Sequence, residues 1–167
     1  MLTLLLGGAR SGKSSLAVEL ARAAGAPVVF IATGEARDDE MAERIARHRA
    51  ERPAGWTTVE EPSELAAAIA AAPDGTCTVV DCLSLWVANI LDGGAAAVEA
   101  AAAEAVLAAT RRPGRTIAVS NEVGLGIVPA TPLGRAYRDV LGRVNAIWAG
   151  SADEAFLVVA GRRLRLE

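Results

Sequence analysis

The residues at the start of the chain have the types and spacing of a phosphate-binding loop. Residues 7–14 fit the pattern G-x-x-x-x-G-K-[ST] and follow a short apolar run at residues 2–6. In such a loop, glycines let backbone N–H groups converge on an anion at a helix N-terminus. In this interpretation the Lys13 ammonium would contact the β- and γ-phosphates of a nucleotide, and the Ser14 hydroxyl would ligate Mg²⁺. The predicted phosphate-binding residues are Gly7, Gly8, Ala9, Arg10, Ser11, Gly12, Lys13 and Ser14.

A glycine-rich turn that merely precedes a helix is the alternative interpretation of this segment. Lys13 argues against it, because it is the only lysine among the 17 lysine and arginine residues of the chain. A fork-shaped guanidinium cannot replace a compact ammonium among phosphates, so this is the one position at which lysine is needed. We therefore interpret residues 7–14 as a nucleotide site.

His48 is the only histidine, and it lies in a segment, residues 38–52, whose acidic start and apolar stripe predict a helix. Taken alone, a histidine on a helix is more often a surface residue than a catalyst. The segment and its approach, however, carry Arg37, Arg44, Arg47, Arg49 and Arg52. Imidazole can attack phosphorus and form a covalent intermediate, and guanidinium groups would offset the developing charge. A simple kinase needs no such nucleophile, so Lys13 and His48 together suggest two phosphate reactions.

Carboxylates follow two of the predicted strands. Residues 76–81 form an apolar strand that ends in Asp81, which is the form of the nucleotidase element whose aspartate lies beside Mg²⁺. The loop at residues 121–129 begins with Asn-Glu and is punctuated by glycine, a combination that more often serves a site than a core. We expect Asp81 to act through the metal.

The segment Thr33-Gly34-Glu35 follows another apolar strand, at residues 28–32. Ligands of open α/β sheets bind at the carboxyl ends of the strands, so this tip is expected beside the phosphate-binding loop. An ordinary turn is the alternative interpretation. The segment at residues 56–60 also has strand composition and ends in an acid, Glu60.

The predicted elements alternate between strand and helix along the whole chain. Strands are expected at residues 2–6, 28–32, 56–60, 76–81 and 116–120, with a strand or hairpin at 155–166; helices are expected from the phosphate-binding loop to about residue 24 and at 38–52, 63–72, 95–109 and 132–150. Residues 83–91 are apolar but are not assigned. This alternation predicts right-handed βαβ units and a single α/β domain over residues 1–167, with helices on both faces of a mostly parallel sheet. The expected fold is P-loop nucleoside triphosphate hydrolase-like.

Composition and charge argue against several classes of function. A net charge of −3 argues against general nucleic-acid binding. No apolar run is long enough to span a membrane and no targeting or lipidation signal is present, so we expect a soluble cytoplasmic protein. Cys77 and Cys82 are interpreted as reduced core thiols, because two cysteines at this spacing fit neither a disulfide framework nor a zinc site. The alanine-rich stretch at residues 92–110 predicts a helix and no function.

These motifs together resemble the bifunctional adenosylcobinamide kinase / adenosylcobinamide-phosphate guanylyltransferase family of cobalamin biosynthesis. The resemblance covers essentially the whole chain. Its most specific parts are the run Asn-Glu-Val-Gly-Leu-Gly-Ile-Val-Pro at residues 121–129 and the Arg-Ile-x-x-His helix that contains His48. Further matching segments are residues 31–33, 38–41, 52–53, 81–83, 138–139 and 142–145, with Trp56 and Glu60.

The resemblance implies two reactions in sequence. The family phosphorylates adenosylcobinamide with ATP or GTP, and it then takes GMP from GTP onto a histidine, which transfers it to the new phosphate with release of pyrophosphate. His48 matches that histidine. The matching nucleotide contacts are the phosphate-binding loop with Thr33, Gly34, Glu35, Arg49, Ala50, Glu51, Arg52, Glu60 and Asp81. The resemblance also implies a homotrimer.

Two other functions remain open at this point. One is a P-loop small-molecule kinase without guanylyltransferase activity, which would need the loop and Mg²⁺ but no histidine. The other is a nucleotide-sensing subunit that binds without catalysis. Three separate acids, Asp81, Glu60 and Glu122, disfavour the sensing subunit.

Overall fold

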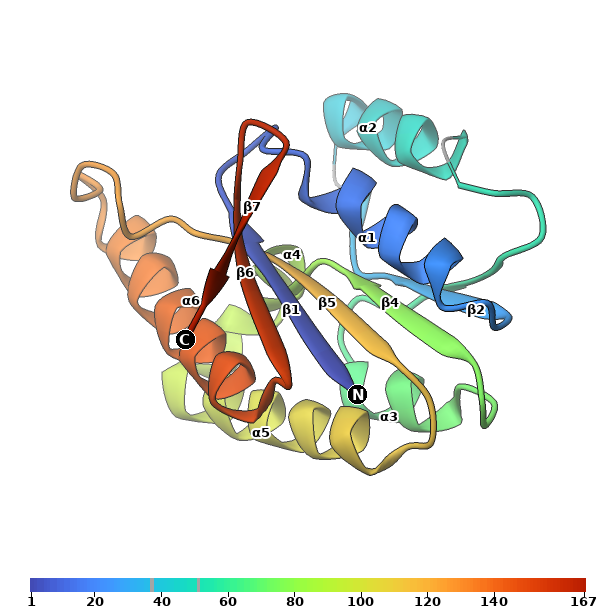
Figure 1. The fold of residues 1–167 in the computed structure, drawn as a ribbon. Coiled ribbons are helices and arrows are strands. Elements are labelled where there is room, and N and C mark those ends of the chain that lie inside the picture. Colours follow the sequence, from blue (N-terminus) through green and yellow to red (C-terminus); the bar gives the residue numbers. More distant parts are fainter. Residues whose placement is uncertain (37, 51) are drawn as a thin grey trace.

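The computed structural model of the protein describes residues 1–36, 38–50 and 52–167, without the side chains of residues 40, 41, 44, 47 and 48. A seven-stranded sheet forms its centre, in the order β3-β2-β4-β5-β1-β6-β7 (Figure 1). The strands are β1 Leu2–Gly7, β2 Val28–Ala32, β3 Thr57–Glu60, β4 Cys77–Asp81, β5 Thr116–Asn121, β6 Glu154–Val159 and β7 Arg162–Leu166. All neighbouring strands are parallel except β6 and β7, which form an antiparallel hairpin. The expected mostly parallel α/β fold is therefore confirmed.

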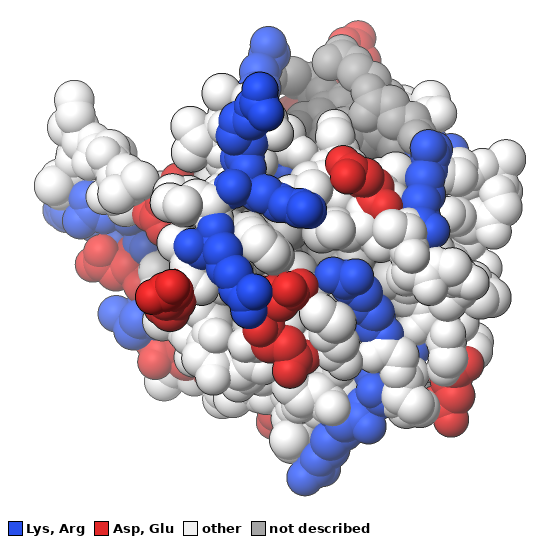
Figure 2. All heavy atoms as spheres, viewed as in Figure 1, with Lys and Arg blue, Asp and Glu red and all other residues white. Residues whose placement is uncertain are grey.

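The apolar runs of the sequence form the interior strands. Every residue of β1 and β2 is buried, as expected for parallel strands that are covered on both faces. β7, in contrast, is exposed along its whole length and supplies three arginines to the surface. Basic side chains, which in β7 are all arginines, accordingly gather over the β6–β7 hairpin (Figure 2).

Six α-helices are present in the described part of the chain: α1 Lys13–Ala23, α2 Asp39–Ala50, α3 Leu65–Ala71, α4 Leu83–Ile90, α5 Ala95–Arg111 and α6 Pro132–Ser151. The segment at residues 83–91, which periodicity did not assign, is α4 followed by a 3₁₀ turn at Leu91–Gly93. The alanine-rich stretch is the helix α5, as predicted. None of the helices in the described residues is both long and apolar enough to cross a membrane.

Two cores lie on opposite faces of the sheet. On one face, Ala17 and Ala21 of α1 pack against Leu5, Val79 and Ile117 of the strands. On the other face, α3, α4, α5 and α6 cover the alternate strand residues in a larger apolar cluster. Helices on both faces were predicted from the alternation of elements, and both cores confirm it. The thiol of Cys77 is buried as expected, whereas Cys82 is only half-buried; neither forms a disulfide.

Candidate active site at the carboxyl edge of the sheet

The parallel strands bring most of the predicted residues to one edge of the sheet. Strand pairing aligns Gly7 with Asn121, and it aligns Ala32 with both Asp81 and Glu60. The phosphate-binding loop, Asp81 and Glu60 therefore share the carboxyl edge. β4 and β5 separate the tip of β2 from the loop, so Thr33 lies beside the end of β4 rather than next to β1.

The phosphate-binding loop has a backbone that depends on glycine. A Cβ atom at Gly7 would lie 2.3 Å from the carbonyl oxygen of Val158, closer than any side chain tolerates. Gly12 adopts a left-handed conformation with φ of 99° at the N-cap of α1. Lys13 begins α1 with its side chain only 7% exposed. Its ammonium donates to the carbonyl oxygen of Gly8 at 2.6 Å and lies 3.4 Å from the Ser11 hydroxyl, so the positive charge is held inside the loop.

The β6–β7 hairpin closes on this loop from the far end of the chain. The backbone N–H of Gly161 donates to the carbonyl oxygen of Ser11 at 2.8 Å. A Cβ at Gly12 would lie 3.2 Å from the Gly161 Cα, so the two backbones are in contact. This contact could not be predicted from the sequence, because no local pattern indicates a pairing between segments so far apart in the chain.

Asp81 and Lys13 both lie close enough to the Cys82 thiol to affect its pKa. Burial raises the pKa of the Cys82 thiol to about 11; the neighbouring Asp81 carboxylate adds to this rise, and the Lys13 ammonium opposes it. The thiol is therefore neutral at pH 7, and opposite charges flank it. Asp81 is half-buried at the end of β4, while Ser14 lies half-buried in the first turn of α1.

The donor set fits a magnesium ion that is shared with a nucleotide. In the described residues, no group of three or more His, Cys, Asp or Glu side chains could enclose a metal. Mg²⁺ typically takes one or two protein oxygens and completes its shell with phosphates and water. The Ser14 hydroxyl and the Asp81 carboxylate are donors of that kind.

Replacing Asp81 with asparagine is expected to weaken Mg²⁺-dependent nucleotide turnover, because a neutral amide oxygen is a poorer ligand for a hard cation. We expect the apparent affinity for Mg²⁺ to fall by about tenfold or more, with partial recovery at excess metal. Titration of turnover with MgCl₂ measures the effect. Asp74→Asn is the matched control, since Asp74 is exposed in the turn before β4. If Asp81→Asn and wild type titrate alike, Asp81 is only a strand-end residue.

The end of α2 is tied to β2 and β3 by arginine contacts. Arg49 forms an ion pair with Glu60, the last residue of β3. The Arg52 guanidinium lies 4.0 Å from the centroid of the Phe30 ring, on which Trp56 also stacks. Burial lowers the pKa of Arg52, and the Asp81 carboxylate acts in the opposite direction, so Arg52 lies within electrostatic range of Asp81. The structure thus brings together four of the predicted nucleotide-contacting residues, Arg49, Arg52, Glu60 and Asp81.

Thr33 makes contacts that are structural in kind. It is fully buried, and its hydroxyl accepts from the Cys82 N–H at 2.8 Å and donates to the Cys82 carbonyl oxygen at 2.7 Å. Gly34 follows in the space beneath α2 and α4, since a Cβ there would lie 3.4 Å from Leu85 and 3.5 Å from Ile45. Glu35 is exposed. α2 therefore packs over the tip of β2.

His48, Glu51 and three of the arginines named with them, Arg37, Arg44 and Arg47, lie wholly or in part outside the described residues. The backbone of His48 belongs to α2, but its side chain lies outside the described residues. Glu51 lies outside them altogether, directly after Ala50 at the end of α2. The placement of α2 is nevertheless fixed by Ile45 and Arg49, which lie one turn before His48 and one residue after it.

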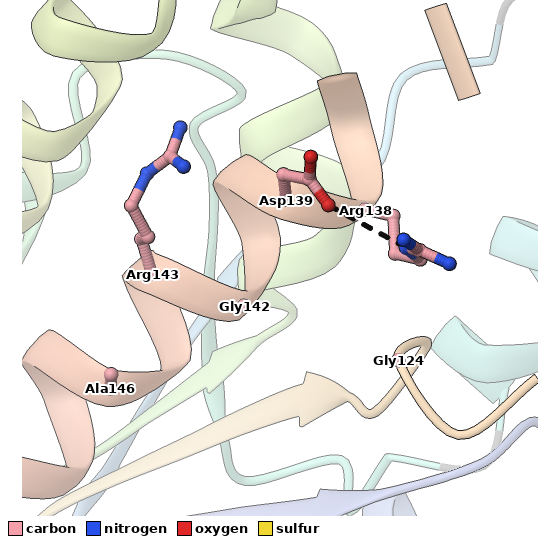
Figure 3. Close-up of a pocket in the computed structure, with 6 residues that line it drawn as sticks. All are labelled: Gly124, Arg138, Asp139, Gly142, Arg143 and Ala146. Carbon is pink, nitrogen blue, oxygen red and sulfur yellow. Dashed lines mark ion pairs between the residues drawn. The ribbon is translucent and has the colours of Figure 1, made fainter. Parts of the chain in front are cut away.

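A shallow depression of about 470 Å³ lies between α6 and the loop that follows β5. Its lining residues are Gly124, Arg138, Asp139, Gly142, Arg143 and Ala146 (Figure 3). Arg138 pairs with Asp139 at 3.6 Å, while Arg143 points away from them and pairs with Glu99 of α5. The adjoining loop exposes apolar side chains at its tip, with Ile127 97% exposed.

The fold and the loop define the class of protein: an α/β nucleotide-binding protein of the P-loop type. An ATPase from the type III secretion system of pathogenic bacteria has a similar fold, with a TM-score of 0.54 at 12% identity over 93% of this chain and 51% of that one. The sequence matches the family model described as cobinamide kinase / cobinamide phosphate guanyltransferase over residues 3–166. The chain therefore belongs to that family.

Full-length relatives agree with this assignment. The bifunctional adenosylcobalamin biosynthesis protein CobP of Pseudomonas aeruginosa is 46% identical over 176 residues, which cover 100% of this chain and 98% of the relative. The bifunctional adenosylcobalamin biosynthesis protein CobU of Salmonella typhimurium is 42% identical, and that of Escherichia coli is 38% identical, each with full coverage of both chains.

Proposed function

We propose that this protein is a bifunctional enzyme of adenosylcobalamin biosynthesis. It phosphorylates adenosylcobinamide with ATP or GTP, and it then transfers GMP from GTP to the phosphate just formed. One observation supports this proposal above all: Lys13, Asp81 and the Arg49–Glu60 ion pair lie at the same edge of the sheet. That edge holds a phosphate-binding loop on one side and the helix with the only histidine on the other.

In the kinase reaction, the hydroxyl of the amidopropanol group attacks the γ-phosphorus of the nucleotide. A new O–P bond forms, the bond to the β-phosphate oxygen breaks, and the nucleoside diphosphate leaves. The loop N–H groups and Lys13 hold the phosphates and offset the charge that builds up on the transferred group. Ser14 and Asp81 would hold an Mg²⁺ ion, which would supply further charge neutralisation when bound with the nucleotide.

In the transfer reaction, the imidazole of His48 attacks the α-phosphorus of GTP. A P–N bond forms and pyrophosphate leaves. A phosphate oxygen of adenosylcobinamide phosphate then attacks the same phosphorus, releasing His48 and giving adenosylcobinamide-GDP. We assign the nucleotide contacts of this step to Thr33, Gly34, Glu35, Arg49, Ala50, Glu51, Arg52, Glu60 and Asp81. The ion pair between Arg49 and Glu60 supports this assignment, because it holds the end of α2 at the carboxyl edge.

The proposal includes the setting of the enzyme. We place it in the cytoplasm as a homotrimer, in keeping with the family resemblance. The absence of any membrane-spanning helix from the described residues is compatible with this placement. Gel filtration with light scattering measures the oligomeric state directly.

The deciding experiment is incubation of the purified protein with labelled GTP. The expected product is a phosphoramidate on His48, labile to acid and stable to base. Label at the α-phosphate is therefore expected to remain on the protein, and label at the γ-phosphate is not. A protein that phosphorylates cobinamide without forming this adduct is a kinase alone, and one that does neither while binding nucleotide is a sensing subunit.

A further inference from the structure

Asn121 ends the strand that separates the phosphate-binding loop from Asp81. β5 lies between β1 and β4, and its pairing aligns Asn121 with Gly7 on one side and Val119 with Asp81 on the other. The next residue, Glu122, donates its backbone N–H to the Gly7 carbonyl oxygen at 3.0 Å. The end of β5 is thus fixed directly against the first residue of the loop.

The side chain of Asn121 belongs to the face of the sheet that carries α1. Strand residues alternate between the two faces, and Ile117 and Val119 pack in the core beneath α1. Asn121 continues this series. Its amide Nδ2 donates to the Ser84 hydroxyl at 3.0 Å, which turns the carboxamide over the end of β4. The Asn121 side chain therefore lies between the phosphate-binding loop, which leads into α1 at Lys13, and β4, which ends in Asp81.

A buried polar network holds Asn121 in this position. Asn145 of α6, only 5% exposed, donates to the Asn121 carbonyl oxygen at 3.0 Å and accepts from the Ser120 hydroxyl at 2.6 Å. Tyr137 donates its hydroxyl to the Ser84 carbonyl oxygen at 3.0 Å. These bonds fix the backbone of Asn121 and the Ser84 residue that its carboxamide contacts, so the end of β5 is positioned before any ligand arrives.

The bond to Ser84 uses one of the two hydrogens on Nδ2. Within the described residues, the carboxamide oxygen of Asn121 has no hydrogen-bond partner. A donor and an acceptor therefore stay open at the place where strand order brings the phosphates and Asp81 together. An amide, unlike an arginine, donates there without adding a charge.

We propose that Asn121 is a further residue of the phosphoryl-transfer site, where its carboxamide donates a hydrogen bond to an oxygen of the γ-phosphoryl group during transfer. This rests on the proposed kinase function. In phosphoryl transfer the charge spreads over the equatorial oxygens of the moving group, and a fixed donor aimed at one of them stabilises the transition state more than the ground state. Transfer of GMP to His48 occurs at the α-phosphorus and does not need this contact.

The test compares the two reactions in Asn121→Ala and Asn121→Leu. We expect kcat for cobinamide phosphorylation to fall by about a hundredfold, the usual effect of removing one donor at a developing charge. The dissociation constant for ADP is expected to stay unchanged, as is the rate at which α-labelled GTP modifies the protein. Asn121→Leu keeps the shape of the side chain and loses the donor without adding a charge, so it separates the hydrogen bond from a packing defect. Tyr137→Phe is the matched control, because it removes a hydrogen bond from the same network without touching the carboxamide.

Each outcome decides the proposal. Selective loss of phosphorylation in both Asn121 variants, with the Tyr137→Phe rate retained, supports it. Equal loss of phosphorylation and protein labelling, or weaker ADP binding, shows that Asn121 only supports the fold and overturns it. Unchanged phosphorylation also overturns it. If the wild-type protein itself phosphorylates no cobinamide, the kinase assignment fails first.

Discussion

Replacing His48 with alanine is expected to abolish both the labelled adduct and the transfer of GMP, while cobinamide phosphorylation continues. The reason is chemical: no other imidazole is present in the chain, and the kinase reaction does not use a histidine. The measurement is a pair of assays on one preparation, with retention of α-labelled GTP on the protein and formation of adenosylcobinamide phosphate followed side by side.

The two activities make the His48→Ala result self-controlled, because a folding defect would lower both. Joint loss would assign His48 a structural role on α2. Retained GMP transfer in the variant would end the covalent mechanism and leave direct attack on GTP as the better explanation. His48→Asn offers a second variant, since its amide keeps a polar side chain on the helix but cannot form a stable phosphoramidate.

Replacing Lys13 is expected to lower kinase turnover by about a hundredfold or more, because the ammonium neutralises charge that grows on the β- and γ-phosphates during transfer. Arginine is expected to fail as alanine does. The ammonium is buried against Gly8 and Ser11, and a planar guanidinium does not reproduce the shape or the donor directions of a compact ammonium. Steady-state phosphorylation of cobinamide measures the loss, and circular dichroism verifies that the fold is intact.

Lys13→Met provides a control for packing, since it keeps much of the length of the side chain and removes the charge. Its turnover is expected to match that of the alanine variant, because charge rather than bulk is what the reaction needs. Wild-type turnover in any of the three Lys13 variants would dismiss the assignment of residues 7–14 as the kinase site.

The sequence predicted the elements of this fold better than their arrangement. Parallel strands buried on both faces leave apolar runs that a reader of the sequence can find, and β1, β2 and β5 were found in this way. The segment that became α4 was not assigned, because a helix buried among other helices and strands is apolar on most sides. Strand order follows from packing between distant segments, which leaves no local pattern.

The same limit applies to the site. Lys13, Asp81 and His48 stood out because their residue types or their motif are unusual. Asn121 also appeared, as part of an Asn-Glu pair, but its position between the loop and Asp81 depends on β5 lying beside β1. Nothing in the sequence indicated that Gly161 contacts the phosphate-binding loop, since a glycine in a hairpin turn is common and does not reveal what the turn packs against. Residues that act through long-range neighbours become visible only when the strands are placed.

The place of β1 in the sheet also bears on how the protein is made. β1 precedes the other six strands of the sheet in the sequence, yet its two neighbours are β5 and β6, both from the later part of the chain. Its leucines therefore have no strand partner until β5 (Thr116–Asn121) is present, and the second partner, β6, ends only at Val159. Exposed apolar strands of this kind are prone to wrong pairings, and sheets closed by distant segments form slowly. We therefore expect the phosphate-binding loop to reach its final form late in folding, because Glu122 and Gly161, whose N–H groups hold Gly7 and Ser11, belong to these distant segments.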